Sequence, residues 1–144
     1  MQIDETDRAL IALLQDNARA PVATLARRMG LARTTVQARL DRLESSGAIA
    51  GYALRLGAGA RAPLRATVLL SIEPRAGAAV LARLKSLREV RRVHTTSGRF
   101  DLIVTLETET TAALDDTLDR IGEAKGVKGS ESLIHLATKL DRGA

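Results

Sequence analysis

Two short amphipathic helical patterns on either side of one glycine constrain this chain more than any other stretch of its sequence. In residues 21–47 apolar side chains recur at helical spacing, with a break at Gly30. The side chains that form the two apolar faces are Val22, Leu25, Ala26 and Met29 before the break and Val36, Leu40 and Leu43 after it. Gly30 can adopt the positive φ that ends a helix, and Leu31 can pack between the two helices. The stretch therefore predicts a helix-turn-helix.

The outward side of the second of these helices carries small and polar residues. Thr34 and Ala38 project most directly away from the apolar face, which allows close approach to a surface, and threonine, glutamine and arginine can hydrogen-bond to base edges or phosphates. Between Arg19 and Arg42 the chain has six arginines and one acid, Asp41, a basic excess that favours a polyanion as partner. The residues predicted to contact double-stranded DNA are Arg33, Thr34, Thr35, Gln37 and Arg42, with Arg39, Arg27 and Arg28 as further candidates.

Three of these arginines have a structural alternative. Arg39 lies nearer the buried edge of its helix and could instead form an ion pair with Glu44 or Asp41. Arg27 and Arg28 could touch phosphate or could simply be solvated. The sequence leaves both alternatives open.

Composition narrows the class of protein. The chain has 144 residues and 45% hydrophobic content, which suffice for one ordinary domain or two small ones. Its formal net charge is +5. It has no cysteine, so disulfides, thiolate metal sites and cysteine nucleophiles are excluded, and its two aromatic residues cannot build a stacking platform for single-stranded bases. No apolar run approaches the roughly 18 residues of a membrane span, and the acidic start is unlike a signal peptide. We therefore expect a cytoplasmic protein without a membrane partner.

The residues around the helix-turn-helix predict a further helix and a hinge. Residues 4–7 begin a helix with capping and acidic side chains, and a leucine-rich stripe follows at residues 10–14. The helix ends near Asn17, and Pro21 begins the next helix at its first position. The alternating stretch 49–56 predicts a strand, which is either the wing of a winged helix-turn-helix or the start of a linker. The Gly-, Ala- and Pro-rich residues 57–63 predict a domain hinge.

The second half of the chain alternates strand and helix patterns. Strands are predicted at residues 64–73, 90–97, 100–107 and 127–140, and helices at residues 74–88 and 110–125. Gly98 and Arg99 predict a short hairpin turn between the second and third strands. The order β-α-β-β-α-β is that of the ferredoxin-like split unit, an antiparallel sheet with two helices on one face, so the predicted fold class is α+β. The predicted domains are residues 1–50, a linker at 51–63, and residues 64–144.

Such a sheet has a second face that two helices on one side cannot cover. The strand residues that suggest an apolar excess are Val68, Leu70, Ile72, Leu102, Val104, Leu106, Ile134 and Leu136. Uncovered apolar surface predicts self-association, most simply as a two-fold homodimer. A dimer also suits DNA with paired half-sites.

Spaced motifs in both halves carry a resemblance to a known family. The N-terminal motifs are Asp4 with Asp7, Leu13-Leu14-Gln15, Ala18-Arg19, Leu25-Ala26, Gly30-Leu31, Val36 with Arg39-Leu40, Arg42-Leu43-Glu44, Gly47-Ala48-Ile49 and Gly51-Tyr52. In the second half, residues 98–102 (GRFDL) are similar to a Gly-x-aromatic-Asp turn, and residues 126–136 to the last strand. On these motifs the chain resembles the Lrp/AsnC (feast/famine) transcriptional regulators over nearly its whole length.

This resemblance implies a helix-turn-helix joined to a RAM domain, a ferredoxin-like domain that senses amino acids, dimerises and often builds octamers, with effector pockets between subunits. The residues predicted to bind the effector are Gly98, Arg99, Asp101, Ser130 and Ser132. Asp101 could accept hydrogen bonds from an ammonium group and the serines could donate to a carboxylate, although Asp101 could also simply cap the turn. The family often has serine where Ala32 stands and threonine where the two serines stand. We expect no cofactor beyond this small-molecule effector.

These observations predict a transcriptional regulator, and not an enzyme, whose assembly or DNA affinity responds to a small effector such as an amino acid. An architectural, nucleoid-associated DNA-binding protein with little sequence choice is the alternative. The scaffold also resembles siroheme decarboxylases, but that activity needs a cluster of histidines and basic residues, and His94 and His135 are the only histidines. Neither has a partner at metal-ligand spacing, so no metal site is expected.

Overall fold

The computed structural model describes residues 2–143, which form two compact units. The first unit ends at Leu54 and the second begins at Arg55. Each unit has its own buried apolar cluster. Each is therefore described by itself.

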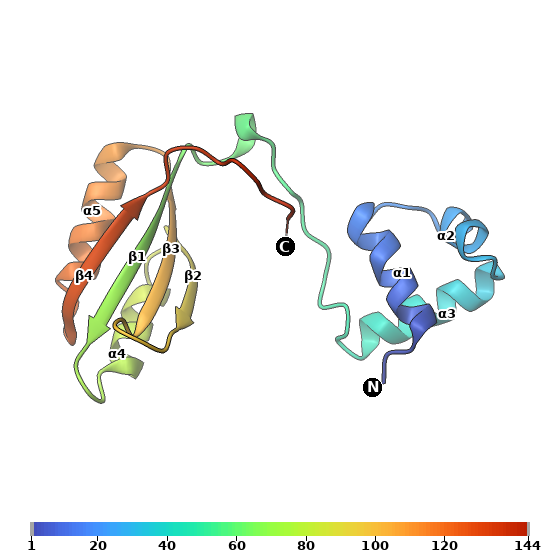
Figure 1. The fold of residues 1–144 in the computed structure, drawn as a ribbon, viewed down its shortest axis with the longest axis horizontal. Helices are drawn as coiled ribbons and strands as arrows, with labels where there is room; N and C mark the ends of the chain where they lie inside the picture. The colour runs from blue at the N-terminus through green and yellow to red at the C-terminus, as the bar shows by residue number, and fades with distance from the viewer. Residues whose placement is uncertain (1, 144) are drawn as a thin grey trace. The chain divides into compact units, whose positions relative to one another are not determined.

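Three helices pack around one small core in the first unit. α1 spans Glu5–Asp16, α2 spans Val22–Met29 and α3 spans Arg33–Ser45 (Figure 1). The buried side chains of this core are Leu10, Leu14, Leu25, Ala26, Val36, Leu40 and Leu43. These are the apolar faces that the helical spacing predicts, so the expectation of a helix-turn-helix in a three-helix unit is confirmed.

The turn between α2 and α3 has the geometry that its glycine predicts. Gly30 has φ 68° and ψ 32°, in the left-handed region where glycine meets no steric penalty. The next backbone N–H, that of Leu31, donates to the Ala26 carbonyl at 3.0 Å, and the Leu31 side chain packs partly buried against the core. Pro21 is the N-cap of α2 and not its first residue, so this helix begins one residue later than expected.

The segment after α3 is not a strand. Residues 50–57 have no regular secondary structure, and a 3-10 turn follows at Ala58–Ala60. The prediction of a wing is therefore wrong for this unit. A strand needs a neighbouring strand to take its backbone hydrogen bonds, and the described part of the first unit contains only helices. The large side chains of the segment, Tyr52, Leu54 and Leu56, are exposed.

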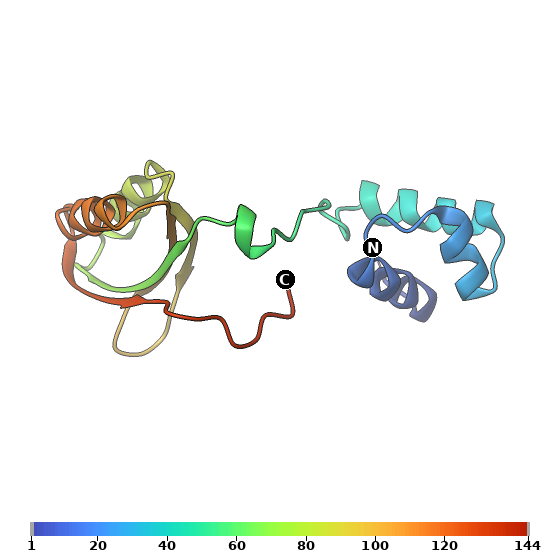
Figure 2. The same ribbon diagram turned by 90° about the horizontal axis from the view of Figure 1, so that it is seen from above.

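The second unit is a four-stranded antiparallel sheet with two helices. Its elements in chain order are β1 (Leu64–Ile72), α4 (Gly77–Lys85), β2 (Val90–Thr95), β3 (Leu102–Thr108), α5 (Thr111–Gly122) and β4 (Val127–Ile134). The strands lie in the order β2-β3-β1-β4, and both helices lie on one face of the sheet (Figure 2). The predicted β-α-β-β-α-β arrangement and the α+β fold class are confirmed.

Most of the apolar strand residues lie on the face that the helices cover. Val68 stands opposite Val104, and Leu70 opposite Leu102, in the β1–β3 ladder. These four side chains and Leu106 are between 0% and 6% exposed and pack against side chains of α4 and α5. The argument that the apolar strand residues exceed what one helical layer can hide is therefore wrong for these five, whereas Ile134 and Leu136, which it also included, are 43% and 96% exposed.

The open face of the sheet holds the strand residues that alternate with the covered ones. Leu69 stands opposite Ile103, and Thr67 lies between Thr105 on β3 and Leu133 on β4. Because side chains alternate along a strand, these residues share the face that no helix covers. The open face is thus mixed, with apolar side chains among threonines.

Several predicted boundaries differ from the structure, and the largest differences are at the strands. β2 ends at Thr95 and β3 begins at Leu102, so the connection runs over residues 96–101 and is longer than the expected two-residue turn. Phe100 lies in this connection and not in a strand. β4 ends at Ile134, where its pairing with β1 ends. One further hydrogen bond follows, from the His135 N–H to the Arg65 carbonyl at 2.9 Å.

Gly126 lies where the chain packs closely against α4. Its φ is 99°, and a Cβ at this position would lie 2.5 Å from the Cβ of Ala76 and 3.3 Å from a methyl group of Val80. The Gly126 carbonyl also accepts from the Glu73 N–H at 2.7 Å. Neither the backbone conformation nor the space suits a side chain here.

The substitution Gly126→Ala is expected to lower the free energy of unfolding of the second unit by about 2–4 kcal/mol, because it adds left-handed strain and a clash. Urea denaturation of the full chain measures this. Gly57→Ala is the matched control, since Gly57 has φ −72° and open space around it, and it should change stability by less than about 1 kcal/mol. Equal stability of the two variants would contradict the packing described for Gly126.

Candidate nucleic-acid interface

The N-terminal half of α3 presents its predicted DNA contacts to solvent. Arg33, Thr34, Thr35 and Gln37 are all exposed. No described residue pairs with Arg33 or hydrogen-bonds to the two threonine side chains. A shallow hollow on this face is lined by Thr34, Thr35, Ala38, Arg39 and Arg42. The structure thus brings four of the predicted residues, Thr34, Thr35, Arg39 and Arg42, to one surface around Ala38.

The first turn of α3 has no side-chain cap. Its N-cap is Ala32, with φ −70° and ψ 148°, and neither Thr34 nor Thr35 replaces the missing capping oxygen. The leading N–H groups of a helix carry the positive end of its dipole, and without a cap they remain available to an external anion. The N–H groups of this helix start can donate to a phosphate oxygen, and Arg33, the exposed first residue of α3, can add a charged donor.

The middle of α3 is bound to the first turn of α1 by four charged side chains, here called the Asp–Arg cluster: Asp4, Asp7, Arg39 and Arg42. The Arg39 Nη1 donates to both carboxylate oxygens of Asp4 at 2.8 Å and to the Asp7 Oδ1 at 3.0 Å. The Arg42 Nη2 donates to the Asp7 Oδ2 at 3.2 Å. Arg39 therefore forms an ion pair, as its structural alternative foresaw, but with Asp4 and Asp7 and not with Glu44 or Asp41.

The two acids of the cluster also cap α1. The Asp7 N–H donates to the Asp4 Oδ1 at 2.8 Å, and the Asp4 N–H donates to the Asp7 Oδ2 at 3.2 Å, which is a reciprocal capping box. Asp7 is fully buried, whereas the Asp4 side chain is 53% exposed. One pair of carboxylates thus satisfies the end of α1 and fixes the direction of two guanidinium groups on α3.

The hydrogen bonds between Asp4 and Arg39 favour the ionised state of both side chains. The Arg39 guanidinium, with help from the Asp7 N–H, lowers the pKa of Asp4 from 3.8 to about 2. In turn the carboxylates of Asp4 and Asp7 raise the pKa of Arg39. Asp4 and Arg39 therefore stay charged at every physiological pH.

The partners of Arg39 and Arg42 were missed at the sequence level, although a signal for them exists. Asp7 lies three residues before Leu10 and seven before Leu14, which places it on the buried stripe of α1. A carboxylate on an apolar stripe requires a buried cationic or hydrogen-bonding partner. Asp41 and Glu44, which were the expected partners of Arg39, bind other side chains. Asp41 accepts from the Gln37 amide at 2.8 Å, and Glu44 accepts from the Tyr52 hydroxyl at 2.8 Å.

The remaining predicted DNA contacts lie on α2. Arg27 and Arg28 are exposed in its last turn, where basic side chains suit the negative end of the helix dipole. Arg28 also borders an apolar hollow formed with Leu13, Met29 and Leu31. Their placement is compatible with phosphate contact and with simple solvation.

The predicted effector residues of the β2–β3 connection are organised around Asp101. The Asp101 N–H donates to the Leu70 carbonyl at 2.8 Å, and its Oδ2 accepts from the Ile72 N–H at 2.9 Å, so this side chain holds the connection against the end of β1. Gly98 has φ 115°, a conformation that suits glycine. The Arg99 guanidinium stacks 5.0 Å from the centre of the Phe100 ring.

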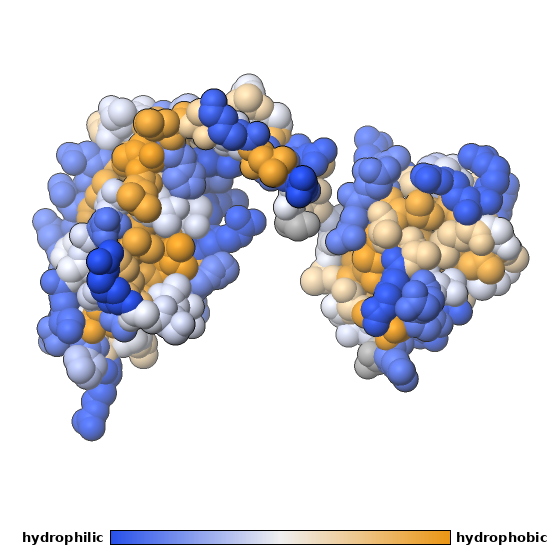
Figure 3. Space-filling model, viewed as in Figure 1, coloured by the Kyte–Doolittle hydropathy of each residue, from blue (hydrophilic) through white to orange (hydrophobic). Residues whose placement is uncertain are grey.

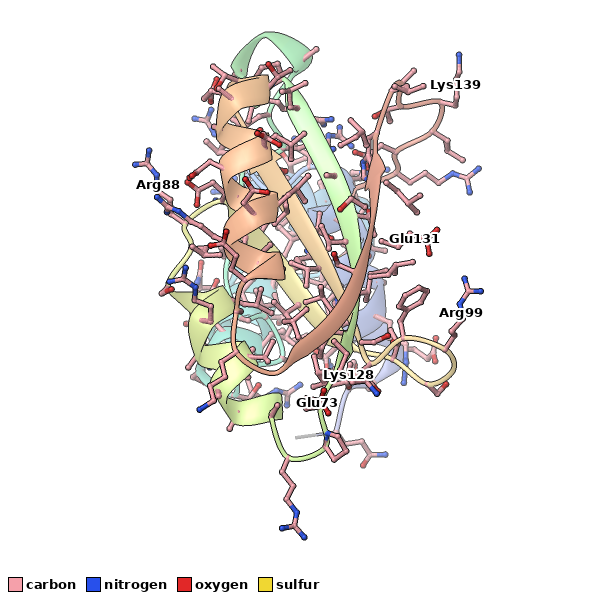
Figure 4. All side chains as sticks on the ribbon, turned by 90° about the vertical axis from the view of Figure 1, so that its left-hand side faces the viewer. Glu73, Arg88, Arg99, Lys128, Glu131 and Lys139 are labelled. Atoms are coloured by element: carbon pink, nitrogen blue, oxygen red, sulfur yellow. The ribbon has the colours of Figure 1, made fainter. Side chains whose placement is uncertain are left out.

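Arg99 approaches β4 on the open face of the sheet. Its Nη2 lies 3.8 Å from the Glu131 Oε2, and Figure 4 shows both side chains on the side of the sheet away from α5. Ser130 and Ser132 stand opposite Leu70 and Val68 and so share the other face. Within one chain, therefore, the serines are not brought together with Arg99, and Glu131 is a neighbour that the sequence did not single out.

The two histidines have no metal-binding surroundings. His135 lies with its Nε2 2.7 Å from the Thr67 hydroxyl, and His94 is exposed on β2. Residues 2–143 contain no group of three or more metal-ligating side chains. Within the same residues no helix is long and apolar enough to cross a membrane.

A helix-turn-helix with an uncapped, basic recognition helix, joined to an α+β unit, defines a DNA-binding protein with an attached regulatory domain. Comparison with known families gives the same division: residues 3–44 match the AsnC-type helix-turn-helix domain and residues 65–144 match the Lrp/AsnC ligand binding domain. The chain belongs to the Lrp/AsnC family of transcriptional regulators.

Individual relatives cover nearly the whole chain. The HTH-type transcriptional regulator FL11 of Pyrococcus abyssi is 30% identical over 139 residues, which are 96% of this chain and 92% of that protein. A feast or famine regulatory protein of M. tuberculosis, solved in complex with L-methionine, is 31% identical and has a TM-score of 0.85 over 97% of this chain and 96% of that one. E. coli AsnC, at 23% identity, shares the fold with a TM-score of 0.90 over 100% of this chain and 99% of that one. The relatives are named as regulators, so this chain is a DNA-binding transcriptional regulator and not an enzyme.

The substitution Asp7→Ala is expected to lower the free energy of unfolding of the first unit by about 2–3 kcal/mol, because Arg39, Arg42 and the Asp4 N–H lose a buried acceptor. Chemical denaturation followed by circular dichroism of the full chain measures this. Glu5→Ala is the control in the same helical turn, since the Glu5 side chain is 98% exposed, and it should cost less than about 1 kcal/mol. A neutral Asp7→Ala variant would contradict a structural role for the cluster.

The lowered pKa of Asp4 makes its contribution to stability depend on pH. Because the folded-state pKa of about 2 lies below the ordinary value of 3.8, this contribution is full above about pH 4 and is lost as the pH falls through 2. Thermal unfolding of the wild type and of Asp4→Asn should therefore differ at about pH 5 and converge near pH 2. A difference that persists unchanged down to pH 2 would show that the Asp4 charge is not involved.

Proposed function

We propose that this regulator binds duplex DNA sequence-specifically through the N-terminal half of α3, and that an amino acid bound in its second unit changes that binding. The observation that carries the proposal is the exposed start of α3, where Arg33, Thr34 and Thr35 surround an uncapped helix N-terminus. Membership of the Lrp/AsnC family supports it.

The start of α3 supplies the two kinds of contact that a DNA reader needs. The free N–H groups and Arg33 suit a phosphate, which fixes the helix on the duplex. The Thr34 and Thr35 hydroxyls, next to the small Ala38, can then approach base edges in the major groove, and Arg33 can donate to guanine. Gln37 can read a base only if its amide leaves Asp41.

The assembly in this proposal is a homodimer, with an octamer as a higher assembly, and the open face of the sheet supports the dimer. Figure 3 shows apolar side chains over this face of the second unit. Leu69, Ile103 and Leu133 lie there among threonines, and Leu133 is 51% exposed. A second copy of the chain would bury this surface and would bring two α3 helices onto paired half-sites.

An amino-acid effector suits the region around Asp101. A solved relative contains L-methionine, and the residues of the β2–β3 connection here offer a carboxylate, an exposed guanidinium and a glycine turn. Ser130 and Ser132 lie on the opposite face, so a pocket that uses them together with Asp101 would have to draw on two chains. An effector at such a site acts only through its different affinities for different assemblies.

Salt-dependent binding to duplex DNA tests the regulatory proposal. The full chain should bind a duplex from beside its own gene more tightly than a random duplex of equal length, and Arg33→Gln should reduce the slope of log affinity against log salt by about 0.9. Arg120→Gln, on α5 beside Asp116, is the control and should leave the slope unchanged. Equal affinity for both duplexes would instead support an architectural DNA-binding protein.

Calorimetric titration with each amino acid tests the effector site. At least one amino acid should bind the wild type, and Asp101→Asn should weaken that binding by about tenfold or more because a charge-assisted acceptor for the ammonium group is lost. Asn can still accept the Ile72 N–H, so the fold is preserved. Asp115→Asn, on the exposed side of α5, is the control. Binding unaffected by Asp101→Asn would place the effector elsewhere.

A further inference from the structure

The two halves of α3 differ in the charge that they can offer to DNA. At the start of the helix, the positive charge of Arg33 is not compensated by any described side chain. Further along, Arg39 and Arg42 face Asp4 and Asp7, so the Asp–Arg cluster carries two positive and two negative charges. The hollow on the exposed face of α3 includes both arginines, so they border the surface that would meet the duplex.

We propose that Asp4 and Asp7 withhold Arg39 and Arg42 from DNA phosphates and thereby limit the sequence-independent affinity of this protein for DNA. The inference rests on the proposed DNA-binding function and deepens it by naming the residues that regulate the DNA-binding surface. Asp4 is a positioning residue in this account, because it acts through Arg39 and touches no DNA itself.

The geometry keeps the acids in place. Asp7 is fully buried, and each of the two carboxylates also accepts a backbone N–H of the capping box. The cluster is therefore held by the end of α1 as well as by the arginines. Asp4, at 53% side-chain exposure and with a pKa of about 2, keeps its charge close to the surface of α3.

The consequence follows from how phosphate contacts generate affinity. A lysine or arginine that neutralises a phosphate releases condensed counterions, which gives sequence-independent and salt-dependent binding. An arginine already compensated inside the protein releases no counterion, and the neighbouring carboxylates repel phosphate. Weak binding to random sequence leaves more protein free to occupy its specific sites among a large excess of competing DNA.

The chain offers a close pair of variants to test this. Asp4→Asn removes one of the two negative charges opposite Arg39, so that the cluster gains one net positive charge, but it keeps a good N-cap, since asparagine caps helices about as well as aspartate. Glu5→Gln is the matched control: it changes the net charge equally in the neighbouring residue, and the only ion pair of Glu5 among the described residues is with Arg8, at 3.8 Å. Any difference between them therefore reports the contact with Arg39 and not net charge.

The experiment measures binding of the full-length variants to a random-sequence duplex at several salt concentrations by fluorescence anisotropy. Asp4→Asn should steepen the slope of log affinity against log salt by about 0.9, the value for one additional phosphate contact, whereas Glu5→Gln should match the wild type. In the double variant Asp4→Asn/Arg39→Gln the slope should return to the wild-type value, because the released arginine is gone. Thermal unfolding confirms that each variant is folded.

Two results would overturn the inference. If Asp4→Asn and Glu5→Gln give the same slope, Asp4 is only a helix cap. If the double variant keeps the steeper slope of Asp4→Asn, the additional contact does not come from Arg39. A wild type that binds no duplex in a salt-dependent way would overturn the proposed function as well, which separates that failure from the first two.

Discussion

The carboxylate of Asp7 is the interaction on which the first unit depends. It is fully buried on the apolar stripe of α1, yet it satisfies the N-terminal end of that helix and accepts from two arginines of α3. The burial of apolar side chains is non-directional. Charge-assisted hydrogen bonds at about 3 Å add a directional constraint, because they require one geometry. The orientation of the exposed face of α3 is therefore set by a contact at the border of that face, made by Arg39 and Arg42.

The second unit solves a different physical problem, which is to cover one face of a sheet and leave the other mixed. Both helices cover the face of the sheet that includes Val68 and Val104, while Leu69 and Leu133 remain on the open face. Asp101 ties the β2–β3 connection to the end of β1, because its N–H donates to the Leu70 carbonyl and its carboxylate accepts from the Ile72 N–H.

Patterns local to one element predicted most of this fold from sequence. Helical spacing around Gly30 predicted the helix-turn-helix, and the alternating patterns predicted the strands and their order along the chain. Both patterns depend on periodicity within one element. The prediction of a strand at residues 49–56 was wrong, because a strand depends on a partner strand that periodicity cannot reveal. The same limit applies to the site: Arg39 and Arg42 were placed correctly on α3, but their partners lie more than thirty residues away in sequence. The prediction that the apolar residues of β1 and β3 would remain partly uncovered was wrong for a related reason. Which alternate residues of a strand the helices cover depends on packing between elements.

A crystal structure of the full chain bound to duplex DNA tests the central claim most directly, because it shows which α3 side chains touch the DNA. The account predicts the Arg33 guanidinium and the Thr34 and Thr35 hydroxyls at the duplex, with Arg39 and Arg42 still within about 3.2 Å of the Asp7 carboxylate. A complex in which Arg39 and Arg42 have left Asp7 and contact phosphates or bases would contradict it.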